Sequence, residues 1–264
     1  MFVVYFRDTK INSIRIILIM DGKKELFQKL QQDILLMQGF KPVSSVKAES
    51  IGLGEIENSF PGGVFPKKAI HEFITILPEH AAASDGFIAG LVAVLMKNGA
   101  ACVWVSTSRR LFPASLSLFN VEPERIIFMD VQSEKDVLWI TEEALKCEGL
   151  AAVVAELNTV SLIESRRLQL AVESSGVTGF ILRKDGNKTA STVATARWKI
   201  SPLPSENEDG MPGLGFPRWQ VELLKVRNGN PGSFVLEWAG EKFKEIKKAE
   251  KQTVWPDLGA RQIV

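Results

Sequence analysis

The chain has 264 residues and few of the residue types that mark a metal site or a disulfide framework. Its two cysteines, Cys102 and Cys147, are too few for a four-cysteine site, and both lie in apolar segments, where reduced core thiols are expected. His71 and Glu72 do not open an H-E-x-x-H zinc motif, because position 75 is threonine. We therefore predict no metal, no cofactor and a reducing, cytoplasmic location.

The chain also lacks a charge excess and a long hydrophobic run. Its net charge of +1 provides no global field for nucleic acid. The first nineteen residues are apolar, but Arg7 and Lys10 interrupt them, and a membrane span needs about 20 apolar residues. We reject a membrane span and a signal peptide. Translation could begin at Met1 or at Met20, since residues 21–38 read as a self-contained amphipathic helix closed by Gly39.

An alternation of strands and helices occupies the middle of the chain. Residues 40–66 are rich in Gly, Pro and Ser and predict a linker on the surface. Apolar strands are then expected at 69–77, 100–107, 125–131, 150–157 and 177–184, with helices at 84–99, 112–120, 134–149 and 161–176. Strands that are apolar throughout are buried on both faces, so the pattern predicts a parallel sheet of βαβ units.

The pattern changes after residue 184. A small, polar stretch at 184–196 predicts a mobile loop, followed by a strand at 197–205, a second loop at 206–217 and a hairpin at 218–238 around "NGNPG". The tail from Glu241 begins as a charged helical run. We predict three parts: an N-terminal helix and linker (1–66), a core domain (67–240) and a C-terminal tail (241–264).

The stretch "ITILPEHAAASDGF" (74–87) joins the first strand to the first helix, where phosphate-binding loops lie in parallel sheets. A working loop has the pattern G-x-x-x-x-G-K-[ST], with glycines that let N–H groups surround phosphate and a lysine that reaches it. This stretch has no lysine, and its only glycine comes late. Ser84 or Asp85 is expected to cap the helix.

Five segments carry a family resemblance: "AIHEFITILPEHAAASDGF", "LWITEEALKCEGLAAVVAEL", "SRRLQLAVESSGVTGFILR", "ARWKISPLPS" and "GFPRWQVELLKVRNGNPGSFVLEW". Together they resemble the RecA-like fold and, more closely, the ImuA family of RecA/SulA-related accessory proteins in bacterial mutagenic DNA repair. The resemblance runs from about Pro61 to Trp238. It implies an α/β, RecA-like core with a mostly parallel sheet flanked by helices and ending in an antiparallel hairpin.

Aligned with the RecA pattern, the loop has lost its catalytic residues. The family's positions fall, in order, on Leu77 (first glycine), Pro78, Glu79, Ala82 (second glycine), Ala83 (lysine) and Ser84 (hydroxyl). The Walker B aspartate falls on Ala155, with Glu156 beside it, and the strand that should precede a catalytic glutamate runs on into Ser108, Arg109 and Arg110. We expect a retained fold element without ATP hydrolysis.

Two regions are candidates for DNA or partner contacts. RecA-like recombinases carry a DNA-binding loop after the fifth core strand, so Arg183, Lys184, Lys188 and Arg197 could contact phosphates; a flexible surface loop is the alternative, and no aromatic residue is present for base stacking. Arg166 and Arg167 on the helix 161–176, and Trp255 and Leu258 in the tail, could bind a partner. The alternatives are a solvated, salt-bridged helix edge and a tail docked on its own domain.

The resemblance implies a non-catalytic protein of damage-induced (SOS-type) translesion synthesis. Its expected partners are an ImuB-type Y-family polymerase homologue and the mutagenic polymerase complex, with single-stranded DNA as a further ligand and self-association through residues 21–38 left open. A divergent DNA-dependent ATPase and a SulA-like inhibitor of cell division are the alternatives.

Overall fold

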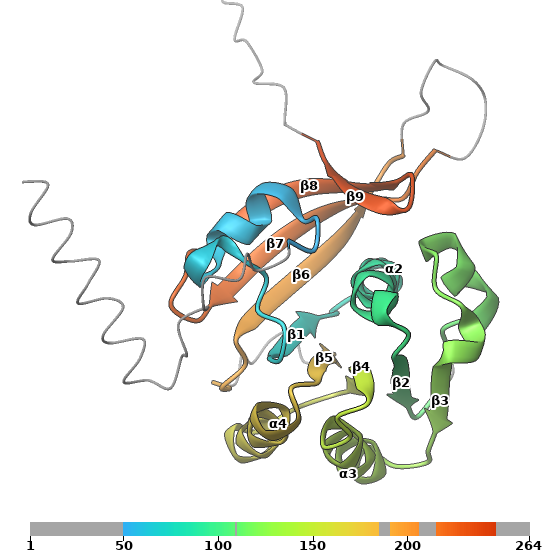
Figure 1. Cartoon of the computed structure of the whole chain (residues 1–264), viewed down its shortest axis with the longest axis vertical. Coiled ribbons are helices and arrows are strands. Elements are labelled where there is room, and N and C mark those ends of the chain that lie inside the picture. The colour runs from blue at the N-terminus through green and yellow to red at the C-terminus, as the bar shows by residue number, and fades with distance from the viewer. Residues whose placement is uncertain (1–49, 109, 185–190, 206–214, 247–264) are drawn as a thin grey trace, which may run out of the picture. The chain divides into compact units, whose positions relative to one another are not determined.

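The structure is a computed structural model that describes residues 50–108, 110–184, 191–205 and 215–246 (Figure 1). Within these residues a single sheet contains nine strands in the order β3-β2-β4-β5-β1-β6-β7-β8-β9. The strands are β1 (Ile70–Ile74), β2 (Ala101–Ser106), β3 (Ile126–Asp130), β4 (Leu150–Leu157), β5 (Thr178–Arg183), β6 (Ala196–Leu203), β7 (Arg218–Val226), β8 (Gly232–Ala239) and β9 (Lys242–Glu245). The α-helices are α2 (Pro78–Leu95), α3 (Glu134–Leu145) and α4 (Leu162–Ser175), and short 3-10 helices are η1 (Gly54–Ser59), η2 (Pro61–Gly63), η3 (Met96–Asn98), η4 (Pro113–Phe119) and η5 (Pro123–Arg125).

The sheet is parallel from β3 to β6 and antiparallel from β6 to β9. Helical crossovers join β1 to β2, β2 to β3, β3 to β4 and β4 to β5, as the alternating pattern predicts. The predicted α/β, RecA-like fold, with a mostly parallel sheet flanked by helices and ending in antiparallel strands, is confirmed.

Helices cover the two faces of the parallel part separately. Side chains alternate along the strands, so that Val154 and Phe180 face a core beneath α2, whereas Val153 and Ile181 face a second core beneath α3 and α4. Figure 1 shows α2 on one side of the sheet and α3 and α4 on the other. Helix α4 begins at a capping box of Ser161 and Glu164, as the sequence pattern favours.

The prediction of a surface linker is wrong for residues 50–66. Leu53, Ile56, Phe60 and Phe65 are buried in the core beneath α2. Their segment is also fastened by backbone hydrogen bonds, one of them from Asn230 N to the Ser59 carbonyl (2.9 Å). Gly and Pro residues of this segment lie in two short 3-10 helices. The buried apolar side chains within and beside these helices pack the segment against the core.

The start of the tail is a strand rather than the predicted helix. Gly240 and Glu241 both have positive φ (59° and 61°), the backbone of a two-residue hairpin turn, so Lys242 comes back beside Ala239. Strand β9 then buries Phe243 against Trp238, with ring centroids 5.0 Å apart. The hairpin therefore gains a third strand, in which Lys242 and Lys244 are exposed and Phe243 between them is buried.

The two cysteines differ in environment. Cys102 is buried in β2 as expected, and burial raises the pKa of its thiol. Cys147 is exposed, which corrects its prediction as a core thiol. Helix α3 ends at Leu145, so Cys147 falls in the turn that follows rather than on the buried face.

Helix α2 with η3 (Pro78–Asn98) is long and apolar enough to cross a membrane by length and composition alone. Most of that stretch is buried within the fold, as is usual for the central helix of a folded domain.

His71 is a structural residue at the centre of an aromatic cluster. Its ring stacks on Phe65 at 4.4 Å, its Nε2 lies 2.9 Å from the Pro66 carbonyl, and Trp198 Nε1 donates to its Nδ1 at 3.3 Å. Nδ1 therefore acts as the acceptor and Nε2 as the donor, which defines a neutral tautomer. Burial, only partly offset by the hydrogen bond to Pro66, lowers the pKa of His71 to about 4.

This environment predicts that His71 makes stability depend on pH. The folded pKa of about 4 lies below the ordinary value of 6.5, so the unfolded chain binds the extra proton and stability is lost as pH falls from 6.5 towards 4. We expect the stability advantage of the wild-type protein over His71→Gln to shrink by about 3 kcal/mol between pH 7.5 and pH 4. Urea unfolding of both proteins across this range measures it, and other titrating groups cancel in the difference. Parallel stability curves would contradict the assignment.

Candidate functional site

The segment aligned with a phosphate loop is helical. Helix α2 begins at Pro78, with Leu77 as its extended N-cap and no side-chain cap. Leu77 and Ala82 are exposed, and so are Pro78 and Glu79 in the first turn. The prediction that Ser84 or Asp85 caps the helix is wrong, because α2 starts six residues before Ser84; Ser84, Ala83 and Asp85 are buried within it. An alanine-rich stretch after a proline favours this early start.

The early helix uses amide groups that a phosphate loop would direct at a ligand. The N–H groups of His80 and Ala81 both donate to the Leu77 carbonyl, at 3.0 and 3.1 Å. In a phosphate loop, successive N–H groups remain free to surround an anion. Here helical turns occupy that segment, and Ala83 has no charge to offer a phosphate.

The acidic residue beside the Walker B position is already engaged. Glu156, at the end of β4, is buried; Trp104 Nε1 donates to its Oε1 (3.3 Å) and Arg110 donates to its Oε2 (2.7 Å). Ala155 before it is fully buried. The carboxylate therefore links β4 to β2 and to the segment after β2. In a RecA-like ATPase, that segment after β2 would be expected to carry the catalytic glutamate.

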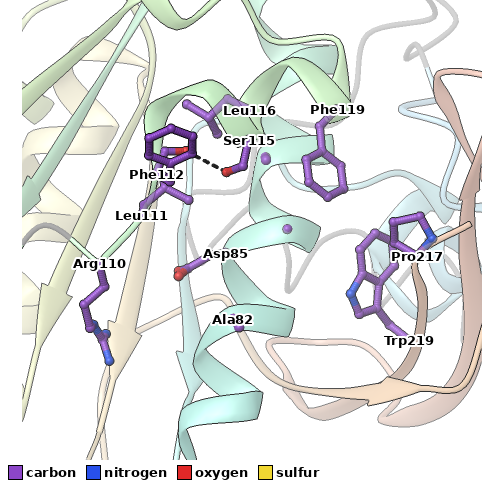
Figure 2. A pocket seen from close by; sticks show the side chains of 12 residues that line it. Ala82, Asp85, Arg110, Leu111, Phe112, Ser115, Leu116, Phe119, Pro217 and Trp219 are labelled. Atoms are coloured by element: carbon purple, nitrogen blue, oxygen red, sulfur yellow. Dashed lines mark hydrogen bonds between the residues drawn. The ribbon is translucent and has the colours of Figure 1, made fainter. Parts of the chain in front are cut away.

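A pocket of about 360 Å³ lies along α2 (Figure 2). Its lining comes from three parts of the fold: Ala82, Asp85, Gly86 and Ala89 of α2; Arg110, Leu111, Phe112, Ser115, Leu116 and Phe119 before and within η4; and Pro217 and Trp219 at the start of β7. Pockets of this size accommodate side chains or small ligands. The small α2 residues open the space: a Cβ on Gly86 would lie 3.0 Å from the Phe119 ring.

Asp85 is the polar feature of this pocket that sequence reasoning missed. The residue is 8% exposed, and its Oδ1 has no hydrogen-bond partner among the described residues. Burial first, and the nearby Glu156 second, raise the pKa of Asp85 to about 7, against the opposing effect of Arg110. The sequence feature that could have indicated this position is an acidic residue within an otherwise apolar helix, which we interpreted as a helix cap.

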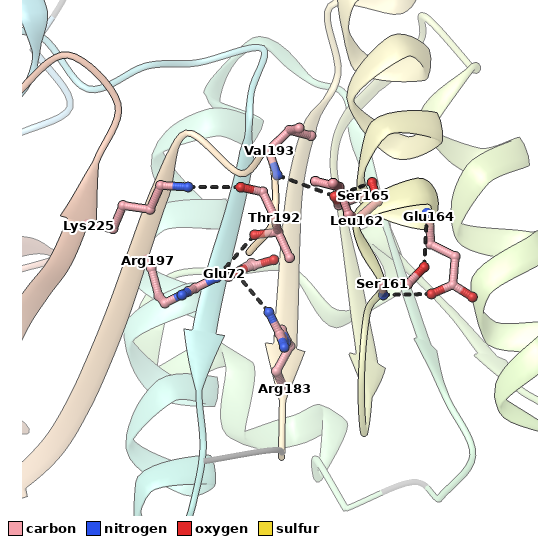
Figure 3. A network of polar contacts seen from close by, with 10 residues as sticks. All are labelled: Glu72, Ser161, Leu162, Glu164, Ser165, Arg183, Thr192, Val193, Arg197 and Lys225. Carbon is pink, nitrogen blue, oxygen red and sulfur yellow. Dashed lines mark hydrogen bonds and ion pairs between the residues drawn. The ribbon is translucent and has the colours of Figure 1, made fainter. Parts of the chain in front are cut away.

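Arg183 and Arg197, predicted as DNA contacts, are buried. Arg183 NH1 lies 3.1 Å from Glu72 Oε2, and Arg197 donates through Nε and NH2 to the same oxygen at 2.9 and 2.8 Å (Figure 3). Neither guanidinium faces solvent, which corrects their assignment to DNA. The reason is the sheet order: β1 lies between β5 and β6, so Glu72 is flanked by both arginine-bearing strands.

The end of the predicted mobile loop is docked on the fold. Thr192 is buried and its hydroxyl accepts from Arg197 NH2 (3.1 Å), while Lys225 Nζ donates to its carbonyl (2.8 Å). Val193 N donates to Ser165 Oγ on α4 at 3.3 Å (Figure 3). Lys184 is exposed at the end of β5, and Lys188 lies outside the described residues.

Two of the residues predicted for partner binding lie on the outer side of α4. Arg166 and Arg167 are exposed, and Arg167 pairs with Glu142 of α3, in agreement with the salt-bridged alternative for that residue. Exposed apolar side chains accompany them on α3 and α4: Trp139, Leu162, Ile163 and Leu170. Trp255 and Leu258 lie outside the described residues. No group of three metal-ligating side chains occurs in the part of the chain that the structure describes.

Comparison with known proteins finds curated relatives. Two proteins named "Protein ImuA", from Caulobacter vibrioides strains NA1000 / CB15N and ATCC 19089 / CIP 103742 / CB 15, are each 35% identical to this chain over 200 residues. The match covers 71% of this chain and 82% of each relative. No protein-family model matches the chain.

The Glu72 network predicts a large effect of a single charge change. Glu72→Gln keeps the shape but leaves two buried guanidinium groups without their carboxylate, so we expect a loss of about 3–5 kcal/mol in the free energy of unfolding. The matched control is Glu222→Gln, which breaks the half-exposed Lys199–Glu222 pair and should cost less than about 1 kcal/mol. Urea unfolding followed by tryptophan fluorescence measures both. Equal, small losses would show that the buried pair contributes little.

Proposed function

Because this chain belongs to the ImuA family, we propose that it is a non-catalytic accessory protein of damage-induced, error-prone translesion DNA synthesis in the cytoplasm. The proposal assigns it an ImuB-type Y-family polymerase homologue as its partner within a mutagenic polymerase complex. It acts by binding, with the RecA-like sheet as a scaffold for contact surfaces.

One observation carries the non-catalytic part of the proposal: helix α2 begins at Pro78, inside the segment that would hold phosphate. Its first amides are bonded to Leu77, the lysine position is the buried Ala83, and Glu156 is held by Trp104 and Arg110. Each of these removes a component that ATP hydrolysis needs. The same features weigh against the divergent ATPase, and no feature of the described residues favours a SulA-like inhibitor.

The outer face of α3 and α4 is the surface that we assign to the partner. Exposed Trp139, Ile163 and Leu170 lie there with the exposed Arg166 and Arg167. Aromatic, aliphatic and arginine side chains together are typical of the energetic centre of protein interfaces. DNA contact, in contrast, is reduced to Lys184 and Lys188, since both arginines of the predicted set are buried.

The partner assignment predicts a stable complex. We expect the full chain to bind the ImuB-type protein in calorimetry, and Ile163→Ser with Leu170→Ser to weaken binding at least about tenfold, because each removes an exposed apolar contact. Leu118→Ser, an equally exposed apolar residue of η4 on the opposite side of the sheet, is the control and should leave the affinity unchanged. Absence of any association would remove the proposed partner, while equal effects of both variants would remove the proposed surface.

The non-catalytic assignment predicts that ATP neither binds at micromolar concentration nor turns over, with or without single-stranded DNA. Equilibrium dialysis of labelled ATP and a phosphate-release assay on the full chain measure this. Micromolar affinity together with turnover would overturn the assignment and favour the divergent ATPase.

A further inference from the structure

The pocket along α2 has a polar floor and an apolar rim. Asp85 lies on the floor with small residues at helical spacing, Ala82, Gly86 and Ala89, which form one face of the helix. Figure 2 shows Asp85 projecting from α2 on the side that faces the segment carrying Arg110, with Phe119 and Trp219 on the other side. The pocket therefore offers a carboxyl group on one side and aromatic rings on the other.

Asp85 lacks a hydrogen-bond donor. Asp85 is more than nine-tenths buried, and it is one of the residues that line the pocket. Its Oδ1 is buried and has no hydrogen-bond partner among the described residues. Burying a carboxyl group without a partner is costly, and a group left in this state on a pocket floor is typical of a site that a ligand completes. The ligand must then supply N–H or O–H donors at Asp85.

The charges around Asp85 favour a cation. Glu156 of β4 adds a second negative charge and Arg110, after β2, a positive one, but Arg110 is already paired with Glu156 at 2.7 Å. The lining residues of η4 and β7, among them Ser115, Phe119 and Trp219, carry no charge. One carboxylate charge therefore remains unbalanced at the pocket floor, and a cationic ligand would balance it.

The rim favours a ligand attached to a protein segment. Phe112 is 71% exposed at one edge of the pocket, and Pro217 is exposed at the opposite wall. Large apolar side chains exposed beside a pocket are typical of surfaces that another protein covers. Aromatic rings also suit a guanidinium group, which is planar, weakly hydrated and attracted to ring faces.

We propose that the α2 pocket binds an arginine side chain of a protein partner, with the guanidinium donating to Asp85 and a neighbouring apolar residue of the same segment packing on Phe112 and Pro217. The proposal is independent of the polymerase-homologue assignment, because that assignment uses the α3–α4 face on the other side of the sheet. Failure of either one leaves the other standing.

The chemistry of the pocket can be tested with benzamidine, a cationic aromatic probe, and with benzamide, its neutral isostere. In amide NMR spectra of the full chain we expect benzamidine to give saturable shifts of α2 and η4 residues, and benzamide to bind at least about tenfold more weakly. Asp85→Asn, which keeps the shape and removes the charge, should weaken benzamidine binding by about the same factor. Glu79→Gln, on the exposed first turn of α2, is the matched control and should bind as the wild type does.

Binding of benzamidine to the pocket should also depend on pH and on the free volume of the pocket. Because Asp85, with a pKa of about 7, must be ionised to hold a cation, benzamidine affinity should rise about tenfold from pH 6 to pH 8. Ala82→Phe, at an exposed helix position, should block the pocket without unfolding the protein, which circular dichroism checks. This second variant keeps the test decisive if Asp85→Asn is poorly folded.

The protein-segment part of the proposal needs a peptide. The capped peptide Ac-Phe-Arg-Phe-NH2 should compete with benzamidine, and the same peptide with citrulline, the neutral counterpart of arginine, should not. Three results would each overturn the proposal. Benzamide would bind as tightly as benzamidine; Asp85→Asn and Ala82→Phe would both bind benzamidine as the wild type does; or the citrulline peptide would compete with benzamidine. Adenosine binding in place of benzamidine would assign the pocket to a nucleobase and would also overturn it.

Discussion

The fold depends on one buried carboxylate, Glu72 of β1, next to β6, the strand where the parallel sheet meets its antiparallel extension. The carboxylate is 1% exposed and bonds Arg183 of β5 and Arg197 of β6, so three adjacent strands share one ionic centre. Removing a charge from water is expensive, and only close partners offset that cost. The network consequently dictates where residues 191–196 lie, because Thr192 is bonded to Arg197 and Lys225.

This centre also accounts for what the protein can present to nucleic acid. The two arginines that were predicted to contact phosphates are buried and hold the sheet together, so they are not available to DNA. Glu156 has a comparable structural role. It follows Ala155, which aligns with the Walker B aspartate, and it accepts hydrogen bonds from Trp104 and Arg110. In both places, side-chain types familiar from RecA-like enzymes have become structural.

Much of the architecture was predictable from periodicity. The strand expected at 150–157 is β4 (Leu150–Leu157), and the helix expected at 161–176 is α4 between its Ser161 cap and Gly176. The misses have local causes. Alanines after Pro78 extended α2 into a presumed loop, and two positive-φ residues turned a charged run into β9. In the 50–66 segment, the Gly and Pro content indicated a surface linker, although apolar residues such as Phe65 are buried in the core.

The amino-acid sequence by itself determined the order of strands and helices, the family resemblance and the loss of the phosphate-loop glycines and lysine, because these follow from residue types at short spacing. Only the tertiary structure decided that Arg183 and Arg197 are buried, and that Asp85 faces a pocket instead of capping a helix. Burial and pairing depend on segments far apart in the chain: Glu72 meets Arg197 across 125 positions. Such contacts are a property of the sheet order, and spacing along the sequence does not encode them.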